Sequence, residues 1–253
     1  MPQATINRRA RELNVYINRD DVSKFVHLVK DTNPIHTNKR IAIAKGFSDT
    51  PIPGTMLHAY FEQLVLVCGF DPSAYSLKFI DFSYPGDILR FRVKNQSENG
   101  LELECLNSEG IVVASCNSSK LRTSPDVETT GSSEAFYDYE ISKQRRNLFY
   151  SHLGVEPNER VPVSLVSAFV PASLLNFLSE QQGDHEGVYR RIDFILHQTP
   201  EIGDLRVGLY FKGQRRIKDK FIYNVGGECS QDGKRVLSAK LHIITSFDFK
   251  TLS

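Results

Sequence analysis

The chain has 253 residues, with 31 Lys and Arg against 30 Asp and Glu and a formal net charge of +1 at pH 7. This balance lacks the basic excess of proteins that bind nucleic acids, so we expect no nucleic-acid partner. Hydrophobic residues make up 40% of the chain and charged residues 24%, as in globular proteins with a sizeable core. The longest apolar run, residues 64–68, is far too short to cross a bilayer, so we also expect no membrane partner.

The N-terminal residues and the cysteines favour a cytoplasmic protein. The basic pair Arg8-Arg9 has no apolar stretch behind it, so no signal peptide can be read. The cysteines are scattered, with no CxxC pair and no His at metal-ligand spacing, which predicts reduced thiols and no metal site. They are Cys68, Cys105, Cys116 and Cys229.

The first third of the chain predicts a strand and two short helices. Residues 15–17 are β-prone, and Asp20-Asp21 can cap a helix with apolar residues every three or four positions. Those apolar positions are Val22, Phe25, Val26 and Val29. Asp31 then falls at or just past the end of this helix. A second short helix is expected over residues 38–44, closed by Gly46.

A buried helix and a run of strands are predicted next. Residues 54–67 are apolar nearly all round, with only Glu62 and Gln63 clearly polar, which is typical of a helix in a core. Four β-like segments separated by turn residues follow and predict an antiparallel meander. They span residues 75–82, 88–94, 101–106 and 111–120.

The most informative segment is Asp31-Thr32-Asn33-Pro34-Ile35-His36. The residue before a proline is pushed toward extended geometry, so the carboxylate and the imidazole lie on a loop. Shortly after, Pro53-Gly54 opens the apolar helix, whose first N–H groups have no partners within the helix. A carboxylate, an imidazole and a bare helix N-terminus can together move protons beside a thioester carbonyl.

These residues resemble a known signature. Residues 31–36, five further residues and then Ala42 resemble the motif of the MaoC-like (R)-specific enoyl-thioester hydratases and dehydratases. The resemblance directly covers residues 31–60, and the helix-then-meander order fits the fold of that family. This fold is the α+β hot-dog fold, a long helix wrapped by an antiparallel sheet. The family usually has Gly-Met where this chain has Gly54-Thr55-Met56, a departure that bears on pocket shape more than on chemistry.

The resemblance implies roles for individual residues. Asp31 and His36 would orient and deprotonate a water and deliver a proton to C2 of the acyl chain, in a division of labour that the sequence leaves open. The N–H of Gly54 would stabilise the thioester oxygen, and a side chain there would hold the thioester away from the backbone. The expected substrate-binding residues are Asn33, Pro53, Thr55 and His58. His58 also fits a core histidine, and Asp31 and His36 taken singly fit a helix cap and a loop histidine.

The second half of the chain repeats this order. Residues 122–134 are polar and predict a linker. Beyond them, residues 164–178 predict a second apolar helix, in which Pro171 can produce a kink. Residues 192–194, Ile-Asp-Phe, repeat residues 80–82, and further strand-like segments follow. These segments are residues 207–211, 221–225 and 240–245.

We therefore predict a tandem (double) hot-dog fold, with modules over residues 1–121 and 135–253. The modules should pair as a pseudo-dimer, with their helices side by side and their sheets joined edge to edge. The second module lacks the Asp/His motif, so we expect one acyl chain per polypeptide, bound near Gly54. A homodimer of whole chains is left open.

The resemblance predicts a hydro-lyase of fatty acid metabolism that acts on acyl-CoA or acyl carrier protein substrates and needs no cofactor. The basic pairs Arg190-Arg191 and Arg215-Arg216 fit either a contact with coenzyme A or carrier protein, or solvated strand ends. Two alternatives remain open at this point. One is a hot-dog acyl thioesterase, and the other is a non-catalytic subunit that binds acyl thioesters.

Overall fold

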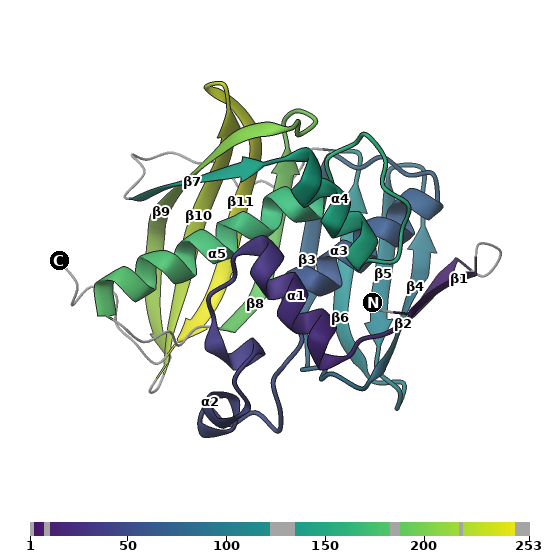
Figure 1. Ribbon diagram of the computed structural model, residues 1–253, viewed down its shortest axis with the longest axis horizontal. Helices are drawn as coiled ribbons and strands as arrows, with labels where there is room; N and C mark the ends of the chain where they lie inside the picture. Colours follow the sequence, from purple (N-terminus) through teal and green to yellow (C-terminus); the bar gives the residue numbers. More distant parts are fainter. Residues whose placement is uncertain (1–2, 8–10, 122–134, 183–187, 218–219, 246–253) are drawn as a thin grey trace.

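The computed structural model describes residues 3–7, 11–121, 135–182, 188–217 and 220–245. Its strands form one antiparallel sheet of eleven strands, in the order β1-β2-β4-β5-β6-β3-β8-β11-β10-β9-β7. The helices lie on one side of this sheet (Figure 1). The predicted linker over residues 122–134 lies outside the described residues, and the domain boundaries drawn beside it stay predictions.

The first half of the chain has the predicted order of elements. Its elements are β1 (Gln3–Asn7), β2 (Glu12–Tyr16), α1 (Arg19–Val29), a 3-10 turn (Pro34–His36), α2 (Lys39–Ala44), α3 (Gly54–Val67), β3 (Ala74–Phe79), β4 (Ile88–Gln96), β5 (Gly100–Leu106) and β6 (Val112–Ser119). The expected cap of α1 was wrong. Asn18 caps it, because its side chain accepts the N–H of Asp21 and the Asp21 side chain accepts the N–H of Asn18.

The second half repeats this order. Its elements are β7 (Ala135–Ile141), α4 (Lys143–His152), α5 (Val163–Gln182), β8 (Val188–Leu196), β9 (Gly203–Ile217), β10 (Lys220–Gln231) and β11 (Lys234–Thr245). The sequence did not predict β1, β7 or α4, and it predicted shorter β9, β10 and β11. The window Val163–Glu180 of α5 is long and apolar enough to cross a bilayer, but 78% of it is buried inside the protein. This burial is what a central core helix requires.

The order of the strands shows an internal two-fold repeat. On one side it reads β2-β4-β5-β6-β3 and on the other β7-β9-β10-β11-β8, so β3 and β8 meet at the centre. These two strands pair antiparallel, from Ala74 opposite Ile195 to Lys78 opposite Arg191. The sheets thus join edge to edge, as the repeat in the sequence predicted. One central helix for each group of strands fits the tandem hot-dog arrangement.

The central helices α3 and α5 pack antiparallel near this centre. His58 of α3 contacts Ser167 of α5, with 3.0 Å between Nδ1 and Oγ, and these two residues are 109 positions apart. Further along, the buried carboxylate of Glu62 accepts the N–H groups of Val163 and Ser164 at 2.8 and 2.9 Å, and also the Ser164 hydroxyl. Glu62 therefore caps α5 from the neighbouring module.

Two buried histidines make the folded protein sensitive to acid. Burial lowers the pKa of His58 to about 3 and the pKa of His152 to about 4, from an ordinary value of 6.5. The unfolded chain therefore binds more protons than the folded chain below pH 6.5. Stability is fully present above that pH and falls as the pH is lowered, by about 1.4 kcal/mol per pH unit for each histidine between roughly pH 6 and 4.

Urea unfolding at pH 7, 6 and 5 measures this loss. His58→Gln keeps a polar group beside Ser167 but does not titrate. The free energy of unfolding of this variant should therefore fall less steeply with decreasing pH, by the contribution of about one bound proton. An equal slope in the wild type and in His58→Gln would show that His58 is not the titrating group.

Candidate active site

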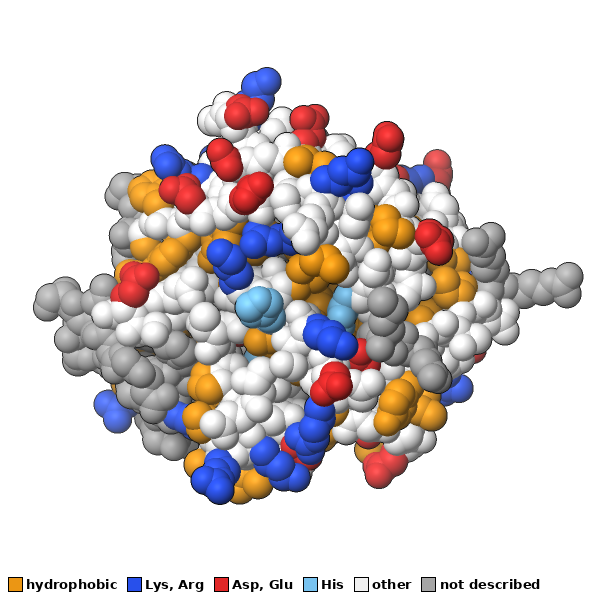
Figure 2. All heavy atoms as spheres, viewed as in Figure 1, with side chains coloured by type: hydrophobic (Ala, Val, Ile, Leu, Met, Phe, Trp, Pro, Cys, Tyr) orange, Lys and Arg blue, Asp and Glu red, His pale blue; other side chains and the backbone are white. Residues whose placement is uncertain are grey.

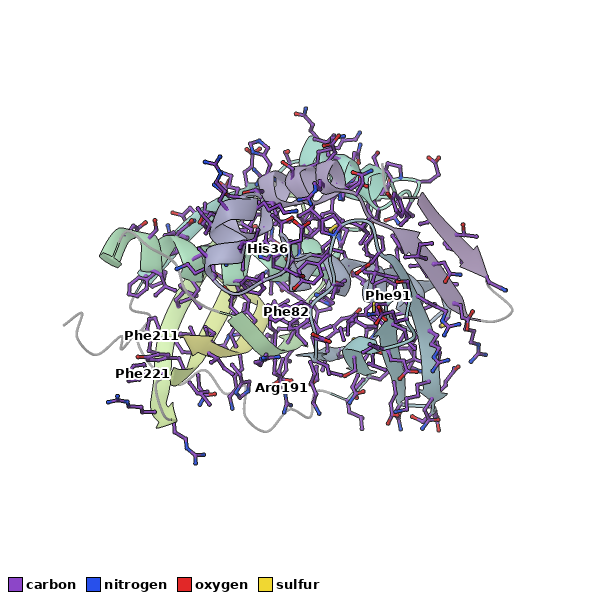
Figure 3. All side chains as sticks on the ribbon, turned by 90° about the horizontal axis from the view of Figure 1, so that it is seen from below. His36, Phe82, Phe91, Arg191, Phe211 and Phe221 are labelled. Carbon is purple, nitrogen blue, oxygen red and sulfur yellow. The ribbon has the colours of Figure 1, made fainter. Side chains whose placement is uncertain are left out.

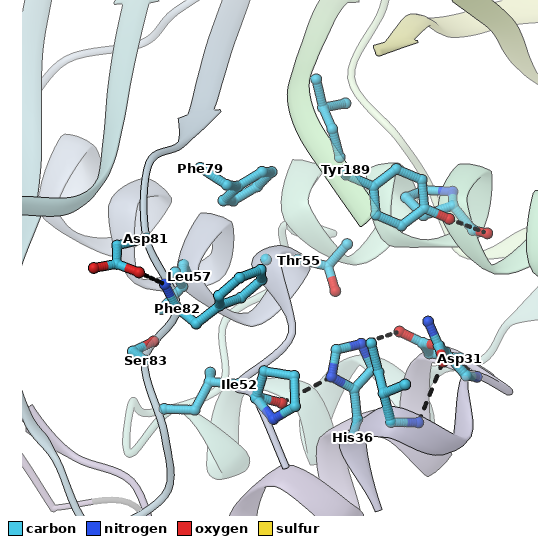
Figure 4. Close-up of a pocket in the computed structure, with 16 residues that line it drawn as sticks. Asp31, His36, Ile52, Thr55, Leu57, Phe79, Asp81, Phe82, Ser83 and Tyr189 are labelled. Atoms are coloured by element: carbon cyan, nitrogen blue, oxygen red, sulfur yellow. Dashed lines mark hydrogen bonds and ion pairs between the residues drawn. The ribbon is translucent and has the colours of Figure 1, made fainter. Parts of the chain in front are cut away.

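A cavity of about 60 Å³ lies at the start of α3, and both modules contribute to its wall (Figure 4). Its lining includes five residues predicted from the sequence: Asp31, Asn33, His36, Gly54 and Thr55. The second module supplies Pro171, Tyr189 and Ile192.

The loop after α1 fixes the position of Asp31. Lys30 ends the helix in a left-handed conformation, with φ 56°, and the N–H of Asp31 bonds back to the carbonyl of Val26 at 3.0 Å. The N–H of Asn33 then donates to Asp31 Oδ1 at 2.9 Å, and the Asn33 side chain accepts the N–H of Ile35 at 3.2 Å. Asn33 is thus a buried residue that shapes the loop. Asp31 keeps its second oxygen, Oδ2, available to the cavity.

The orientation of His36 follows from a single hydrogen bond. Its Nδ1 lies 2.8 Å from the carbonyl oxygen of Pro51. A carbonyl only accepts, so Nδ1 carries the hydrogen, and Nε2 of the neutral ring is left with a lone pair. This Nε2 lies 3.8 Å from Asp31 Oδ2. The distance is too long for a direct hydrogen bond, and an oxygen atom in the cavity can approach both groups.

The start of α3 faces the same cavity. Pro53 precedes the first helical residue and offers no capping side chain, so the N–H groups of Gly54 and Thr55 have no acceptor within the helix. A ring covers part of this surface: a Cβ added to Gly54 would lie 2.6 Å from Cζ of Phe79. Gly54 is therefore needed for the close approach of Phe79, in addition to the approach of a thioester that the sequence suggested.

Two residues predicted to bind substrate lie elsewhere. Pro53 turns the chain into α3 and does not line the cavity. His58, one turn further on, points toward the second module, where it stacks on Phe194 with 5.2 Å between ring centroids. It is 1% exposed and belongs to the core. Of the two places that the sequence allowed for His58, core or pocket, the structure has the core, because that face of α3 packs against α5.

The sequence did not indicate the residues that close the cavity from the second module. Tyr189 donates its hydroxyl to the carbonyl of Pro171 at 3.1 Å, and burial, with the nearby Asp31 charge, raises its pKa well above the usual range. On the first module's side, the rings of Phe79 and Phe82 line the cavity. The only sequence signal near them was the Ile-Asp-Phe repeat, which contains Phe82.

Among the basic residues noted in the sequence, Arg190 contacts a residue that lines this cavity. The guanidinium of Arg190 lies over the ring of Phe82, 5.9 Å from its centroid. Arg191 instead pairs with Asp193 at 2.9 Å, and Figure 3 shows it on the far side of Phe82 from His36. Arg216 lies over Phe221, far from His36 in the same view. Arg190 thus lies next to the cavity wall, on the ring of Phe82.

Within the described residues, no group of three His, Cys, Asp or Glu side chains is arranged to hold a metal ion. The chemistry available at the cavity is that of a carboxyl group, an imidazole and the positive end of a helix.

The structure is a hot-dog-type fold with a cavity at the start of a central helix, where Asp31 and His36 lie together. Residues 2–109 match the family model described as "MaoC like domain", so this part of the chain is similar to that family. The match covers the module with the Asp/His motif and ends before β6. Among curated proteins, none has a matching sequence.

Solved structures resemble the whole chain in fold. A "MaoC-like dehydratase" has a TM-score of 0.66 at 11% identity, covering 96% of this chain and 97% of the other. A putative MaoC domain protein dehydratase from Chloroflexus aurantiacus gives 0.68 at 11% identity, with coverages of 97% and 94%. A putative oleoyl thioesterase from Lactobacillus plantarum gives 0.56 at 10% identity, with coverages of 94% and 96%. The shared fold therefore serves proteins described as dehydratases and as thioesterases.

Substitution of Gly54 tests the oxyanion role once the clash with Phe79 is removed. Gly54→Ala should lower turnover of an enoyl thioester, but part of that loss would come from displacing the Phe79 ring. In the Phe79→Ala background, which leaves room for the new methyl group, Gly54→Ala should still cost about 100-fold in kcat, because the backbone donor is screened. Equal kcat values for Phe79→Ala and the double variant would mean that Gly54 serves only to make room for the ring.

Proposed function

We propose that the chain catalyses the reversible hydration of enoyl thioesters to (3R)-hydroxyacyl thioesters. The observation that carries this proposal is the arrangement of Asp31 Oδ2 and His36 Nε2, 3.8 Å apart, at a cavity that also contains the bare start of α3. A base next to a helix N-terminus is what the addition of water to a double bond conjugated with a carbonyl requires.

In the proposed reaction, the thioester oxygen lies at the N–H of Gly54, and a water contacts Asp31 and His36. His36 accepts a proton from the water at Nε2, which is its free lone pair while Nδ1–H is held by Pro51. The hydroxide adds to C3, and the C2=C3 electron pair moves through the carbonyl to the thioester oxygen. The enolate then collapses, and C2 takes the proton that His36 had accepted from the water. The hydroxyl and the hydrogen of one water are thereby added, and the reverse steps eliminate it.

Asp31 supports this proton movement from its fixed position. Its Oδ1 is held by the N–H of Asn33, so Oδ2 can orient the water and stabilise the imidazolium that forms on His36. Because the reaction consumes only water, we propose no cofactor beyond the carrier of the acyl group.

The carrier in this proposal is the phosphopantetheine of coenzyme A or of an acyl carrier protein. Arg190, beside Phe82 at the cavity, supplies a positive charge where a phosphorylated handle would leave the site. Elsewhere on the helical face, charges of both signs are scattered (Figure 2). A role in fatty acid metabolism and a cytoplasmic location stay predictions.

The thioesterase remains the second candidate, because a putative oleoyl thioesterase shares the fold. It would direct the water to the carbonyl carbon and release a free thiol. The set of Asp31, Asn33-Pro34 and His36, which resembles the hydratase motif, favours attack at C3. A non-catalytic binding subunit would not require the hydrogen bond from His36 to the carbonyl of Pro51, which leaves Nε2 available as a base.

Crotonyl-coenzyme A separates these functions, since hydration, thiol release and binding without turnover give different products. Asp31→Asn and His36→Ala should each remove most of the hydration activity. The double variant should be little worse than either, because the two groups act as a unit. His197→Ala is a suitable control, because His197 contacts Ser238 in the second module, away from the cavity. Hydration that survives in His36→Ala would contradict the proposal.

The second module should bind no acyl chain of its own. Titration with a non-hydratable acyl-thioester analogue should therefore reach one equivalent per chain, since the helix start of the second module is already occupied by Glu62. A stoichiometry of two would place a second working site in the chain.

A further inference from the structure

The two central helices begin with related sequences. Pro53-Gly54-Thr55 opens α3, and Pro162-Val163-Ser164 opens α5. The same offset relates His58 to Ser167, 109 positions later, and these residues touch where the helices cross. A residue that touches its own counterpart lies on the axis of the internal repeat. Both the sequence and the structure therefore align the start of α3 with the start of α5.

The start of α5 shows what such a helix start can bind. Glu62 Oε1 accepts the N–H of Val163, and Oε2 accepts both the N–H and the hydroxyl of Ser164. Glu62 is 3% exposed. Burial of a carboxylate is costly unless donors replace the lost water, and here two backbone donors and one side-chain hydroxyl do so. Burial raises the pKa of Glu62 and these three donors lower it, so the second module shows which groups favour an oxygen anion at this kind of helix start.

The start of α3 has the same donors but no internal carboxylate. The residue of α5 that corresponds to Glu62 in this alignment is Pro171, which lines the cavity and has no polar side-chain atom. Thr55, the counterpart of Ser164, is 7% exposed, and its Oγ1 is buried without a hydrogen-bond partner. Figure 4 shows this hydroxyl on the side of α3 that faces His36 and Asp31. A buried hydroxyl without a partner in the protein is free to bond to an atom that enters the cavity.

We propose that the Thr55 hydroxyl donates to the thioester oxygen, as a third donor beside the N–H groups of Gly54 and Thr55. The identity of the ligand rests on the proposed function, whereas the three-donor site rests on the comparison with Glu62 and Ser164. The site binds the enolate oxygen more tightly than the neutral carbonyl, because charged acceptors form the stronger hydrogen bonds. Thr55 is therefore a catalytic residue, and its contribution appears in kcat more than in KM.

Two substitutions separate the hydroxyl from the shape of the side chain. Thr55→Val replaces the hydroxyl with a methyl group and should lower kcat by about 100-fold, with little change in KM. Thr55→Ser restores the donor and should stay within a few-fold of the wild type. Because Thr55 Oγ1 has no partner in the protein, Thr55→Val should not lower the midpoint of thermal unfolding. A clear loss of stability in Thr55→Val, with kcat unchanged, would show a structural role and overturn the proposal.

A matched variant in the second module provides the control. Ser164→Ala removes the corresponding hydroxyl from Glu62, so it should lower thermal stability while leaving kcat nearly unchanged. Opposite effects of Thr55→Val and Ser164→Ala would identify one hydroxyl as acting on a ligand and the other as acting on the fold. If both variants lose only stability, the two helix starts have the same structural role and the proposal fails.

An enolate that forms without turnover tests the site independently of the hydration reaction. Acetoacetyl-coenzyme A ionises to an enolate whose absorbance differs from that of the keto form. The wild type should lower the pKa of the bound ligand, Thr55→Ser should do the same, and Thr55→Val should do so less. If the wild type does not hydrate crotonyl-coenzyme A but shows this pattern, the proposed function fails and the three-donor site stands. A bound enolate with the same pKa in all three proteins overturns the three-donor site.

Discussion

The antiparallel pairing of β3 with β8 is the constraint on which the rest of the structure depends. Five residue pairs, from Ala74 opposite Ile195 to Lys78 opposite Arg191, join the two halves into one sheet. This pairing brings Phe79, at the end of β3, and Tyr189, in β8, to the same cavity. It also sets α3 and α5 side by side, because each lies against its own half of the sheet. A cavity that needs walls from both modules can only form at this junction.

The central helices meet through buried polar contacts, although apolar contacts would avoid the cost of burying polar groups. His58 meets Ser167, and Glu62 meets the first residues of α5. A lone buried carboxylate would cost several kcal/mol, but at a helix N-terminus it also satisfies N–H groups that would otherwise lack acceptors and lies at the positive end of the helix dipole. These hydrogen bonds are directional, so they fix the position of α5 along the axis of α3. Purely apolar packing would define that position less strictly. The position of Pro171 in the cavity wall depends on that register.

The sequence predicted what local chemistry determines. The bounds of α3, residues 54–67, were correct, because Pro-Gly opens the helix and its apolar residues cover all faces. The loop with Asp31 and His36 was placed correctly as well, because Asn33-Pro34 allows few conformations.

Other features depend on tertiary contacts and left little trace in the sequence. Helix α4 begins with the polar residues Lys-Gln-Arg-Arg, so its sequence does not look amphipathic, although the helix buries Phe149 and Tyr150. Tyr189 and Pro171 reach the cavity only through the pairing of β8 with β3 and the packing of α5 on α3. The sequence left His58 open between core and pocket for the same reason, because its spacing from Gly54 shows which turn of the helix it occupies but not which neighbour covers that turn.

The Glu62 contact also bears on how such a chain can diverge. In an assembly of two identical subunits, every substitution occurs twice, so a glutamate on the central helix would fill the helix start of each partner and leave neither free for a ligand. A chain that carries both halves can place glutamate in one and proline in the other, because each position mutates separately. Covalent fusion thus permits an inherited asymmetry that a symmetric dimer could not maintain. One half can give up its ligand site for rigidity, while the other is free to adapt its cavity to a new acyl chain.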